Sequence, residues 1–370
     1  MPRVDLRLNP AIPAATLAPV RLTAGPSGKR LQTNQGADWV RIAVGAITRR
    51  RPEGLRRLLE SLARMERPEG TEIAFLFCEN DDESRVSEVV DAFRQEVAEP
   101  VELMLEPTKG IPFARNRVLT AALEQGFDFL TFVDDDEVVE PGWLANLLAA
   151  METRKLDLGG GPVDPVAPDG RLTPMQQAIL DDLIARAKRE ADGRASLAQS
   201  DGDQTVDVYT NNWCLRLAAV RERNLYFDTA TAESGGEDTK FSQDMLALDS
   251  RNGWVPGAWV AEAQTRRRLT LSYQYRRMRD QTRTRSQREG FGRKKSLKNA
   301  SQRYTEALAL LLVLPAITLF SRRRGRETLV RIVRKAALAA GLVGGTLGMR
   351  SYHYAAGNEA MHLEDAADAS

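Results

Sequence analysis

Histidine is almost absent from this chain. Of its 370 residues only two are histidines, His353 and His362, and both lie near the C-terminus. A histidine general base, a serine–histidine pair or a histidine-rich zinc site in the body of the protein is therefore excluded. Proton transfer must fall to carboxylates, and any metal ion must be held largely by oxygen atoms.

Cysteine is nearly as scarce, and Cys78 and Cys214 are far apart in the sequence. This argues against a disulfide framework and fits a reduced, cytosolic setting. A secretory pattern is also missing from residues 1–36, where Arg and Asp interrupt every apolar run. We interpret residues 1–38 as a loose N-terminal leader.

An excess of one charge is missing from the whole chain, which has 52 Lys and Arg, 51 Asp and Glu, and a net charge of +1. Nothing global therefore points to nucleic acid. The balance is broken locally, because fourteen Arg or Lys stand against two acids between Arg266 and Arg303. That stretch is predicted to form a basic face.

Short apolar runs alternate with amphipathic segments through the first part of the chain. The pattern predicts strands at 40–47, 72–78, 101–105, 129–133 and 156–160. It predicts helices from Pro52, from Ser84 as the cap to about 97, at 113–125 and at 141–153. This alternation predicts a doubly wound α/β sheet, whose ligands bind outside the carboxyl ends of the strands.

The pattern weakens after Pro162. We expect a helix at 175–191, a polar loop at 193–203, a strand pair or strand-turn at 206–217, a glycine-led helix at 235–248 and one strand at 254–261. Two apolar stretches, 307–320 and 336–349, follow, with arginines between them. Each is shorter than the ~20 residues of a spanning helix, so a helical hairpin in the membrane interface is predicted. The alternative is a helical pair that packs on the protein or on a second copy.

Three predicted strands end in polar clusters, which should converge on one crevice. They are Thr48-Arg49-Arg50, Glu79-Asn80-Asp81-Asp82 and Asp134-Asp135-Asp136-Glu137. Three acids directly after an apolar strand repel one another, and a divalent cation such as Mg²⁺ or Mn²⁺ relieves that repulsion. A solvated acidic turn is the alternative.

Two further motifs carry candidate chemistry. Glu237 and Asp238 follow two glycines at the start of a predicted helix, where one carboxylate can take a proton from a hydroxyl group. Arg115 and Asn116 lie on the first turns of another helix and are candidates for contact with a diphosphate or a ribose. Taken singly, acids that cap a helix and an arginine on its surface explain these motifs equally well.

Taken jointly, the motifs resemble family 2 glycosyltransferases with the GT-A fold. The features are a Thr-x-Arg-Arg-Pro turn, an acid-Asn pair, GI-x-x-ARN, F-x-DDDE and GGED, in that order between about Arg41 and Arg288. The DDDEVVEPGWL segment and the Thr210–Asn212 run resemble a branch of bacterial exopolysaccharide glucosyltransferases that includes a succinoglycan enzyme.

The resemblance implies a role for each matching position. Ile47, Thr48 and Arg49 would line the nucleobase pocket with Glu79 and Asn80, and Arg115 would face the donor sugar. Asp134 would approach the ribose and the metal, Asp135 the sugar, and Asp136 the metal. Asp238 would be the catalytic base, with Glu237 beside it holding the acceptor. The chain departs from the family at Glu79, where Asp is usual, and after Glu262, where a Pro is missing.

The implied reaction is inverting glycosyl transfer from a nucleotide-diphospho-sugar, by expectation a UDP-sugar, to a saccharide or lipid-linked acceptor. The expected organisation is a GT-A domain at 39–265, a helical extension at 266–352 and a tail at 353–370. The expected location is the cytoplasm, peripheral on the inner face of the membrane. Alternatives are a non-catalytic nucleotide-sugar-binding partner in an assembly complex and a nucleic-acid binder through residues 266–303. A nucleotidyltransferase fits less well, because the glycine-rich basic loop is absent.

Overall fold

The structure is a computed structural model that describes residues 39–199, 208, 210–233, 235–288, 290 and 292–349. The predicted leader at 1–38, the predicted tail at 353–370 and both histidines lie outside these residues. Cys78 and Cys214 are buried and free, as expected from their spacing.

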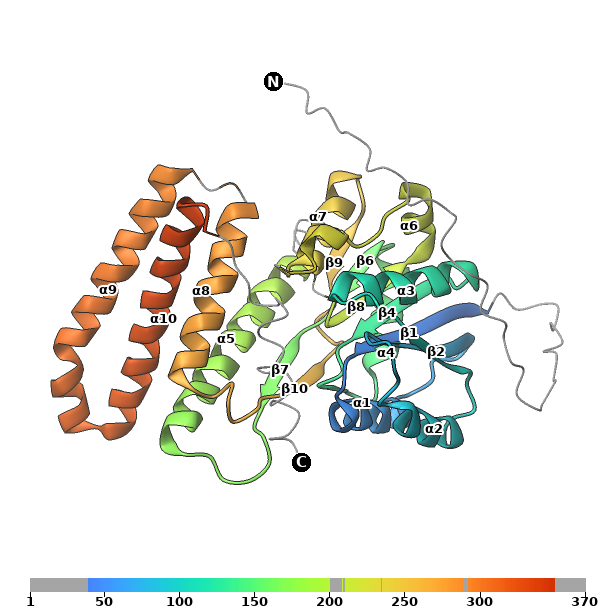
Figure 1. Cartoon of the computed structure of the whole chain (residues 1–370), viewed down its shortest axis with the longest axis horizontal. Helices are drawn as coiled ribbons and strands as arrows, with labels where there is room; N and C mark the ends of the chain where they lie inside the picture. Colours follow the sequence, from blue (N-terminus) through green and yellow to red (C-terminus); the bar gives the residue numbers. More distant parts are fainter. Residues whose placement is uncertain are drawn as a thin grey trace, which may run out of the picture. The chain divides into compact units, whose positions relative to one another are not determined.

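A seven-stranded mixed sheet forms the centre of the fold (Figure 1). In spatial order its strands are β3 (Val101–Leu105), β2 (Thr71–Glu79), β1 (Val40–Thr48), β4 (Phe129–Val133), β8 (Asn212–Arg216), β6 (Leu158–Gly160) and β9 (Asn252–Trp254). Strand β8 runs antiparallel to β4 and β6, and the other neighbours are parallel. The predicted doubly wound sheet is confirmed, with the strands at 40–47, 72–78, 101–105 and 129–133 almost as expected.

Helices cover both faces of this sheet because its strands bury alternate side chains on opposite sides. On β1, Ile42 and Val44 pack into one apolar core and Ala43 into the other. The helices on the first face are α1 (Pro52–Arg64), α2 (Ser87–Glu96) and α4 (Trp143–Thr153). Those on the second face are α3 (Ile111–Glu124), α6 (Leu217–Arg223) and α7 (Glu237–Ala247).

A second, three-stranded sheet was not predicted. It consists of β5 (Glu137–Val139), β10 (Val260–Ala263) and β7 (Val163–Val166), with β10 in the middle. The single strand expected at 254–261 is wrong, because the chain turns at Pro256-Gly257 and enters this other sheet. Of the strand pair or strand-turn expected at 206–217, the structure has a turn at 210–211 and the one strand β8, preceded by residues that are mostly outside the described ranges.

Two helix boundaries also differ from expectation. Ser84 does not cap α2, since its hydroxyl donates to Glu79 Oε2 at 3.0 Å and the helix begins at Ser87. Helix α5 (Pro174–Gln199) takes in residues 193–199 of the loop predicted at 193–203, and the rest of that loop lies outside the described residues. The guanidinium of Arg194 lies over the Trp254 ring, 4.7 Å from its centroid, and this tertiary contact holds the last helical turns.

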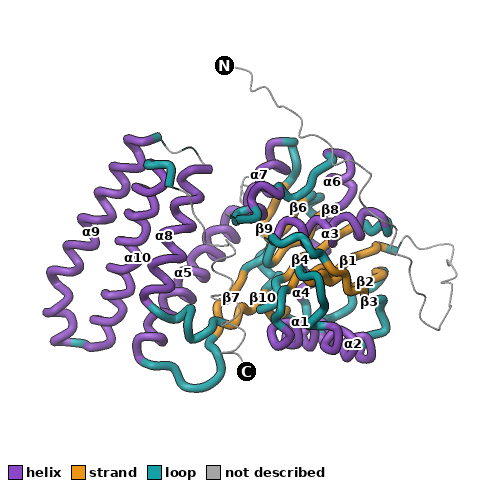
Figure 2. The backbone as a smooth tube through the Cα atoms, in the orientation of Figure 1, coloured by secondary structure: helices purple, strands orange, loops and turns teal. Residues whose placement is uncertain are grey.

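The C-terminal part is helical throughout its described residues (Figure 2). It comprises α8 (Leu271–Arg288), α9 (Arg293–Phe320) and α10 (Arg322–Thr346). Helix α10 packs against α9, α8 and α5. The two apolar stretches therefore form a helical pair, and α10 packs on the protein as the alternative expects, whereas a position in the membrane interface stays a prediction. Ser321 forms the turn, and its hydroxyl oxygen accepts from the Arg324 N–H at 3.3 Å.

Candidate active site

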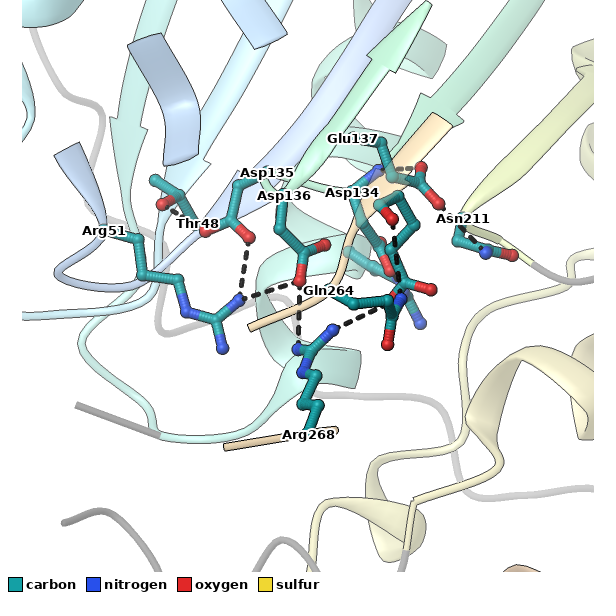
Figure 3. A network of polar contacts seen from close by, with 11 residues as sticks. Thr48, Arg51, Asp134, Asp135, Asp136, Glu137, Asn211, Gln264 and Arg268 are labelled. Carbon is teal, nitrogen blue, oxygen red and sulfur yellow. Dashed lines mark hydrogen bonds and ion pairs between the residues drawn. The ribbon is translucent and has the colours of Figure 1, made fainter. Parts of the chain in front are cut away.

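The ends of β1 and β4 meet around the aspartate triplet (Figure 3). Thr48 Oγ1 donates to Asp135 Oδ2 at 2.7 Å, and Arg51 Nη1 lies 3.1 Å from Asp135 Oδ1. A Cβ on Gly54 would meet the Asp135 carbonyl oxygen at 2.8 Å, so glycine lets the first turn of α1 approach the triplet. The convergence predicted for these strand ends is confirmed.

The three aspartates differ in whether a carboxylate oxygen remains without a hydrogen-bond partner. Asp135 is buried and uses both carboxylate oxygens on Thr48 and Arg51. The side chains of Asp134 and Asp136 are 37% and 20% exposed. Among the described residues, Asp134 Oδ2 and Asp136 Oδ1 have no hydrogen-bond partner. These two oxygens are therefore available to a ligand.

The pKa values of Asp134 and Asp136 shift in opposite directions, because burial and neighbouring carboxylates dominate at Asp134 and nearby arginines dominate at Asp136. Burial, followed by the charges of Asp136 and Asp135, raises the pKa of Asp134 to about 7, although Arg115 opposes the shift. Burial also acts to raise the pKa of Asp136, but Arg268 and Arg51 hold it below its ordinary value. Asp136 is thus the better-stabilised anion of the two.

Glu137 closes the turn after the triplet. Its carboxylate accepts from the Asp134 N–H at 3.0 Å and from Asn211 Nδ2 at 3.1 Å. Burial and then the charge of Asp134 raise its pKa well above the ordinary range. It therefore shapes the turn that presents Asp134 and Asp136.

Two arginines that were not predicted as site residues hold the outer side of the triplet. Arg268 Nη2 lies 3.0 Å from Asp136 Oδ2, and its Nη1 lies 2.7 Å from Glu262 Oε1. Arg51 Nη1 lies 3.7 Å from the same Asp136 oxygen. The sequence signal was present in two runs of three arginines, but pattern alone does not say which member of a run points inward.

Arg115 joins the triplet to the start of α7. Its guanidinium pairs with Glu237 and lies 3.3 Å from Asp134 Oδ1. The Arg115 Cζ atom is also 5.9 Å from the centroid of the Phe227 ring, which belongs to a buried aromatic cluster with Trp213 and Phe241. This apolar backing strengthens the ion pair. The DDDE and GGED motifs therefore belong to one site.

The glycine-led turn before α7 has the backbone that its sequence requires. Gly235 and Gly236 have φ angles of 71° and 85°, in the left-handed region that favours glycine. Glu237 is buried, and burial raises its pKa against the opposing charge of Arg115. Asp238 is half-buried. Its Oδ1 accepts from the Thr239 N–H at 2.6 Å, and its Oδ2 has no partner among the residues described.

Two residues that were predicted to contact the nucleotide-sugar, Glu79 and Asn80, make their hydrogen bonds within the protein. Glu79 accepts from Ser84 and from the Arg85 N–H at 2.8 Å, so its carboxylate organises the loop after β2. Asn80 donates to the carbonyls of Glu106 and Thr108 and accepts from the Gly110 N–H at 2.8 Å. Both residues set the shape of the crevice wall.

The remaining candidates lie at the edges of the crevice or outside it. Ile47 and Arg49 are half-buried at the end of β1. Asn116 does not face the site, because it exchanges two hydrogen bonds with the backbone of Phe227, at 2.9 and 2.8 Å. The basic face expected at 266–303 is partly internal, since Arg268 and Arg279 pair with acids and Arg266 donates to backbone carbonyls.

The carboxylates fit a divalent cation that shares its coordination with a ligand. No cluster of three or more metal-binding side chains occurs among the described residues. Mg²⁺ commonly needs only one or two carboxylates, and takes its other ligands from substrate phosphates and water. Asp134 and Asp136 each have one free oxygen, and a nearby cation would relieve the repulsion between them.

The sequence and the fold were compared with known proteins. The model of the protein family described as Glycosyl transferase family 2 matches residues 44–223 of this chain. The Succinoglycan biosynthesis protein ExoM of Rhizobium meliloti (strain 1021) is 30% identical over 236 residues, which cover 64% of this chain and 71% of that protein.

Solved structures give the same picture of the fold. The mannosyltransferase PcManGT from Pyrobaculum calidifontis, in complex with GDP-Man and Mn²⁺, has a TM-score of 0.55 at 15% identity, covering 83% of this chain and 87% of that one. S. aureus TarS 1–349 in complex with UDP-GlcNAc has a TM-score of 0.47 at 13% identity, covering 84% and 92%. The chain therefore belongs to glycosyl transferase family 2 and has the GT-A fold.

Proposed function

We propose that this glycosyltransferase moves a sugar from a nucleotide-diphospho-sugar to a saccharide or lipid-linked saccharide, with inversion at the anomeric carbon. One observation carries the proposal: Arg115 contacts both Asp134 and Glu237 and so joins the donor carboxylates to the acidic start of α7. The carboxylates that bind the sugar donor and the acids that can accept a proton are thereby brought to one crevice, as a direct displacement requires.

The donor lies across the ends of β1, β2 and β4. Ile47, Thr48 and Arg49 border the nucleobase and ribose, and Glu79 and Asn80 hold the loops that enclose them. Arg51 and Arg268 both lie against Asp136 Oδ2 and leave its Oδ1 free, so they stand beside the crevice, where they can neutralise diphosphate charge. A UDP-sugar is the donor that the resemblance implies.

Asp134 and Asp136 would hold Mg²⁺ or Mn²⁺, with Asp135 fixed behind them by Thr48 and Arg51. When bound, such an ion offsets the negative charge that collects on a leaving diphosphate. Arg115 keeps Asp134 in place from the other side.

Asp238 takes the proton of the acceptor hydroxyl as that oxygen attacks the anomeric carbon. Its free Oδ2 and partial exposure suit this task, whereas Glu237 is committed to Arg115. Glu237 is a positioning residue that orients Arg115 and the first turn of α7. The C–O bond to the diphosphate breaks as the new glycosidic bond forms, so no covalent enzyme intermediate is needed.

Exopolysaccharide biosynthesis at the cytoplasmic face of the membrane is the proposed setting. The succinoglycan biosynthesis protein supports the pathway class by its name. Helix α9 supports the location, because its length and composition make it a candidate for membrane contact and its most apolar stretch is almost entirely uncovered. Its apolar part, residues 307–320, spans about 21 Å, which is short of a ~30 Å hydrocarbon core and favours a helix lying in the interface.

A donor screen tests the function. Purified full-length protein is given UDP- and GDP-sugars with Mn²⁺ and a saccharide acceptor, and release of nucleoside diphosphate is measured. Asp238→Asn should lower the transfer rate by about 10²–10⁴-fold while donor binding persists. Asp244→Asn, on the same helix but paired with Lys240, is the control. Donor binding without turnover by the wild type would instead favour a non-catalytic partner in an assembly complex.

A further inference from the structure

A second cavity lies beside the donor crevice. It has a volume of about 260 Å³ and is enclosed by α5, α8 and the strands β7 and β10. This is close to the lower end of the ~300–1,000 Å³ typical of small-molecule sites, so it fits a single sugar ring with a substituent. Pro162, Val163 and Trp254 contribute apolar wall, and Gln264, Gln274 and Gln281 contribute amides.

Among the described residues that line the cavity, Arg277 is the cation for which no direct ion pair is found. Arg186 pairs with Asp182, Arg194 with Glu190, and Glu262 with Arg268. Arg277 lines the same cavity, is half-buried, and has neither a hydrogen bond nor an ion pair within the described part of the chain. A guanidinium that is partly withdrawn from water and makes no direct ion pair has its N–H groups available to an anionic ligand.

Arg277 acts electrostatically on both sides of the cavity. Burial, and then the charges of Arg334 and Arg277, hold the pKa of Arg186 below its ordinary value despite Asp182. The charge of Arg277 also helps to lower the pKa of Asp136. Arg277 is therefore close enough to act on both Arg186 of α5 and Asp136 of the catalytic crevice.

The cavity adjoins the active site but not the donor wall. Its lining includes Glu262, which pairs with Arg268, and Asn211, which donates to Glu137. None of the residues assigned to the nucleobase and ribose lines it, and neither Arg51 nor Arg115 does. A molecule in this cavity would approach the reacting centre from the side opposite β1 and β2.

We propose that this cavity is an acceptor subsite, in which Arg277 binds a negatively charged substituent, a carboxylate or a phosphate, on the acceptor saccharide. The inference rests on the proposed function and specifies its acceptor. The glutamine amides bind hydroxyl groups of the sugar ring. Pro162, Val163 and Trp254 pack against the apolar face of that ring. Arg277 thereby selects acidic over neutral acceptors.

Binding to the full-length protein tests the subsite without any turnover. The probes are methyl glucuronide, methyl glucoside 6-phosphate and neutral methyl glucoside, and the readout is their dissociation constants by NMR titration. At least one charged probe should bind about tenfold or more tighter than the neutral one, and Arg277→Gln should abolish that difference. Ala187→Trp, which fills the cavity, should weaken every probe.

Arg276→Gln is the matched control, because Arg276 is the exposed neighbour of Arg277 on α8. Equal binding of charged and neutral probes by the wild type, or a selectivity that survives in Arg277→Gln, would overturn the subsite. Within the described part of the chain Arg277 makes no hydrogen bond or ion pair whose loss would unfold the protein, and a melting curve checks this.

Transfer kinetics separate this inference from the function on which it rests. With an acidic acceptor, Arg277→Gln should raise the acceptor KM about tenfold or more and leave the donor dissociation constant within about twofold. An equal rise in the donor constant would place Arg277 on the donor diphosphate and overturn the subsite. If the wild type released no nucleotide from any donor while charged probes bound, the proposed function would fail and the anion site would stand.

Discussion

At the scale of single residues, the ion pair of Arg115 and Glu237 holds the two halves of the active site together. Both side chains are buried, with residue exposures of 5% each, so neither charge can be solvated if its partner is removed. Breaking such a pair costs more than replacing both members by apolar residues. This asymmetry makes the pair's structural and catalytic roles separable.

Arg115→Met should lower the free energy of unfolding by about 3–5 kcal/mol, because Glu237 is left buried beside Asp238 and Asp134 without its cation. Urea unfolding measures this loss. The double variant Arg115→Met, Glu237→Met should recover most of the stability but none of the transfer activity. Recovery of transfer in the double variant would show that the pair serves packing only.

Some residues of the candidate site could be predicted from the sequence and others could not, and the difference has a physical cause. Asp134–Asp136 and Glu237-Asp238 follow from a buried strand and a glycine-led helix start, which are local patterns. Arg51 and Arg268 could not be chosen from their runs, because their direction depends on the backbone turn after β1 and on the second sheet. Asn116 lies on the predicted helix but points away from the site, because its side chain bonds to the backbone of Phe227, which is distant in sequence.

At the scale of elements, Asn212 fastens β8 to the segments that surround the site. Its Nδ2 donates to the carbonyls of Pro162 and Ala258 at 2.9 and 2.7 Å, and its Oδ1 accepts from Trp143 Nε1 at 2.8 Å. The residue is 1% exposed, so each of these polar groups depends on it. The Thr210–Asn212 run is thus a structural element as well as a family motif.

Asn212→Leu should lower the free energy of unfolding by about 3 kcal/mol or more, because it leaves buried carbonyls and an indole N–H without partners. Denaturant unfolding monitored by tryptophan fluorescence checks the value. Asn146→Ala is the control, since Asn146 makes one exposed bond, to the Gly257 carbonyl, and should cost less than about 1 kcal/mol. Similar losses in both variants would contradict the role assigned to Asn212.

Helix α9 presents an apolar face that the rest of the described chain leaves uncovered. Tyr304, Leu308, Leu311, Leu312 and Leu319 recur at helical spacing and are between 44% and 85% exposed. Exposed arginines, Arg322, Arg323 and Arg324, begin the next helix. Such a face with flanking cations matches the interface of an anionic bilayer.

The double variant Leu312→Glu, Leu319→Glu should therefore lose association with vesicles that contain anionic lipid, by about tenfold or more in partition coefficient. Flotation of the full-length proteins measures it. Leu105→Glu, at an exposed apolar residue on β3, should float like the wild type. If the α9 variant floated equally well, the face would not be the membrane contact.

At the scale of the whole molecule, the fold class was predictable because the alternation of strands and helices depends on the pattern of apolar residues within short, continuous segments. Strands β1 to β4, most of the helices that cover them and the C-terminal helical pair follow from local apolar periodicity. The second sheet was not predictable, because β5, β7 and β10 are strands of three or four residues whose pairing is entirely non-local. The extension of α5 was missed for the same reason, since Arg194 meets Trp254 only in the folded chain.

That second sheet matters to function because it places Glu262 and the following Arg268 against Asp136. The proposed acceptor side of the molecule is therefore built from its least predictable part, between β7, β10, α5 and α8. The donor side is built from β1, β2 and β4, whose sequence patterns are the strongest. This division explains why the donor class could be inferred from sequence and the acceptor could not.

The central claim is that Asp134 and Asp136 bind a nucleotide diphosphate through a divalent cation. Calorimetric titration of UDP and GDP into the full-length protein, with Mn²⁺ and with EDTA, tests it most directly. Asp136→Asn is compared with Asp128→Asn, which lies just before β4 at its opposite end and bonds the Arg41 N–H.

Mn²⁺ should strengthen nucleotide binding to the wild type and to Asp128→Asn by about tenfold or more, and should have little effect on Asp136→Asn. Equal affinity of the wild type in Mn²⁺ and EDTA, or an undiminished Mn²⁺ effect in Asp136→Asn, would contradict the account.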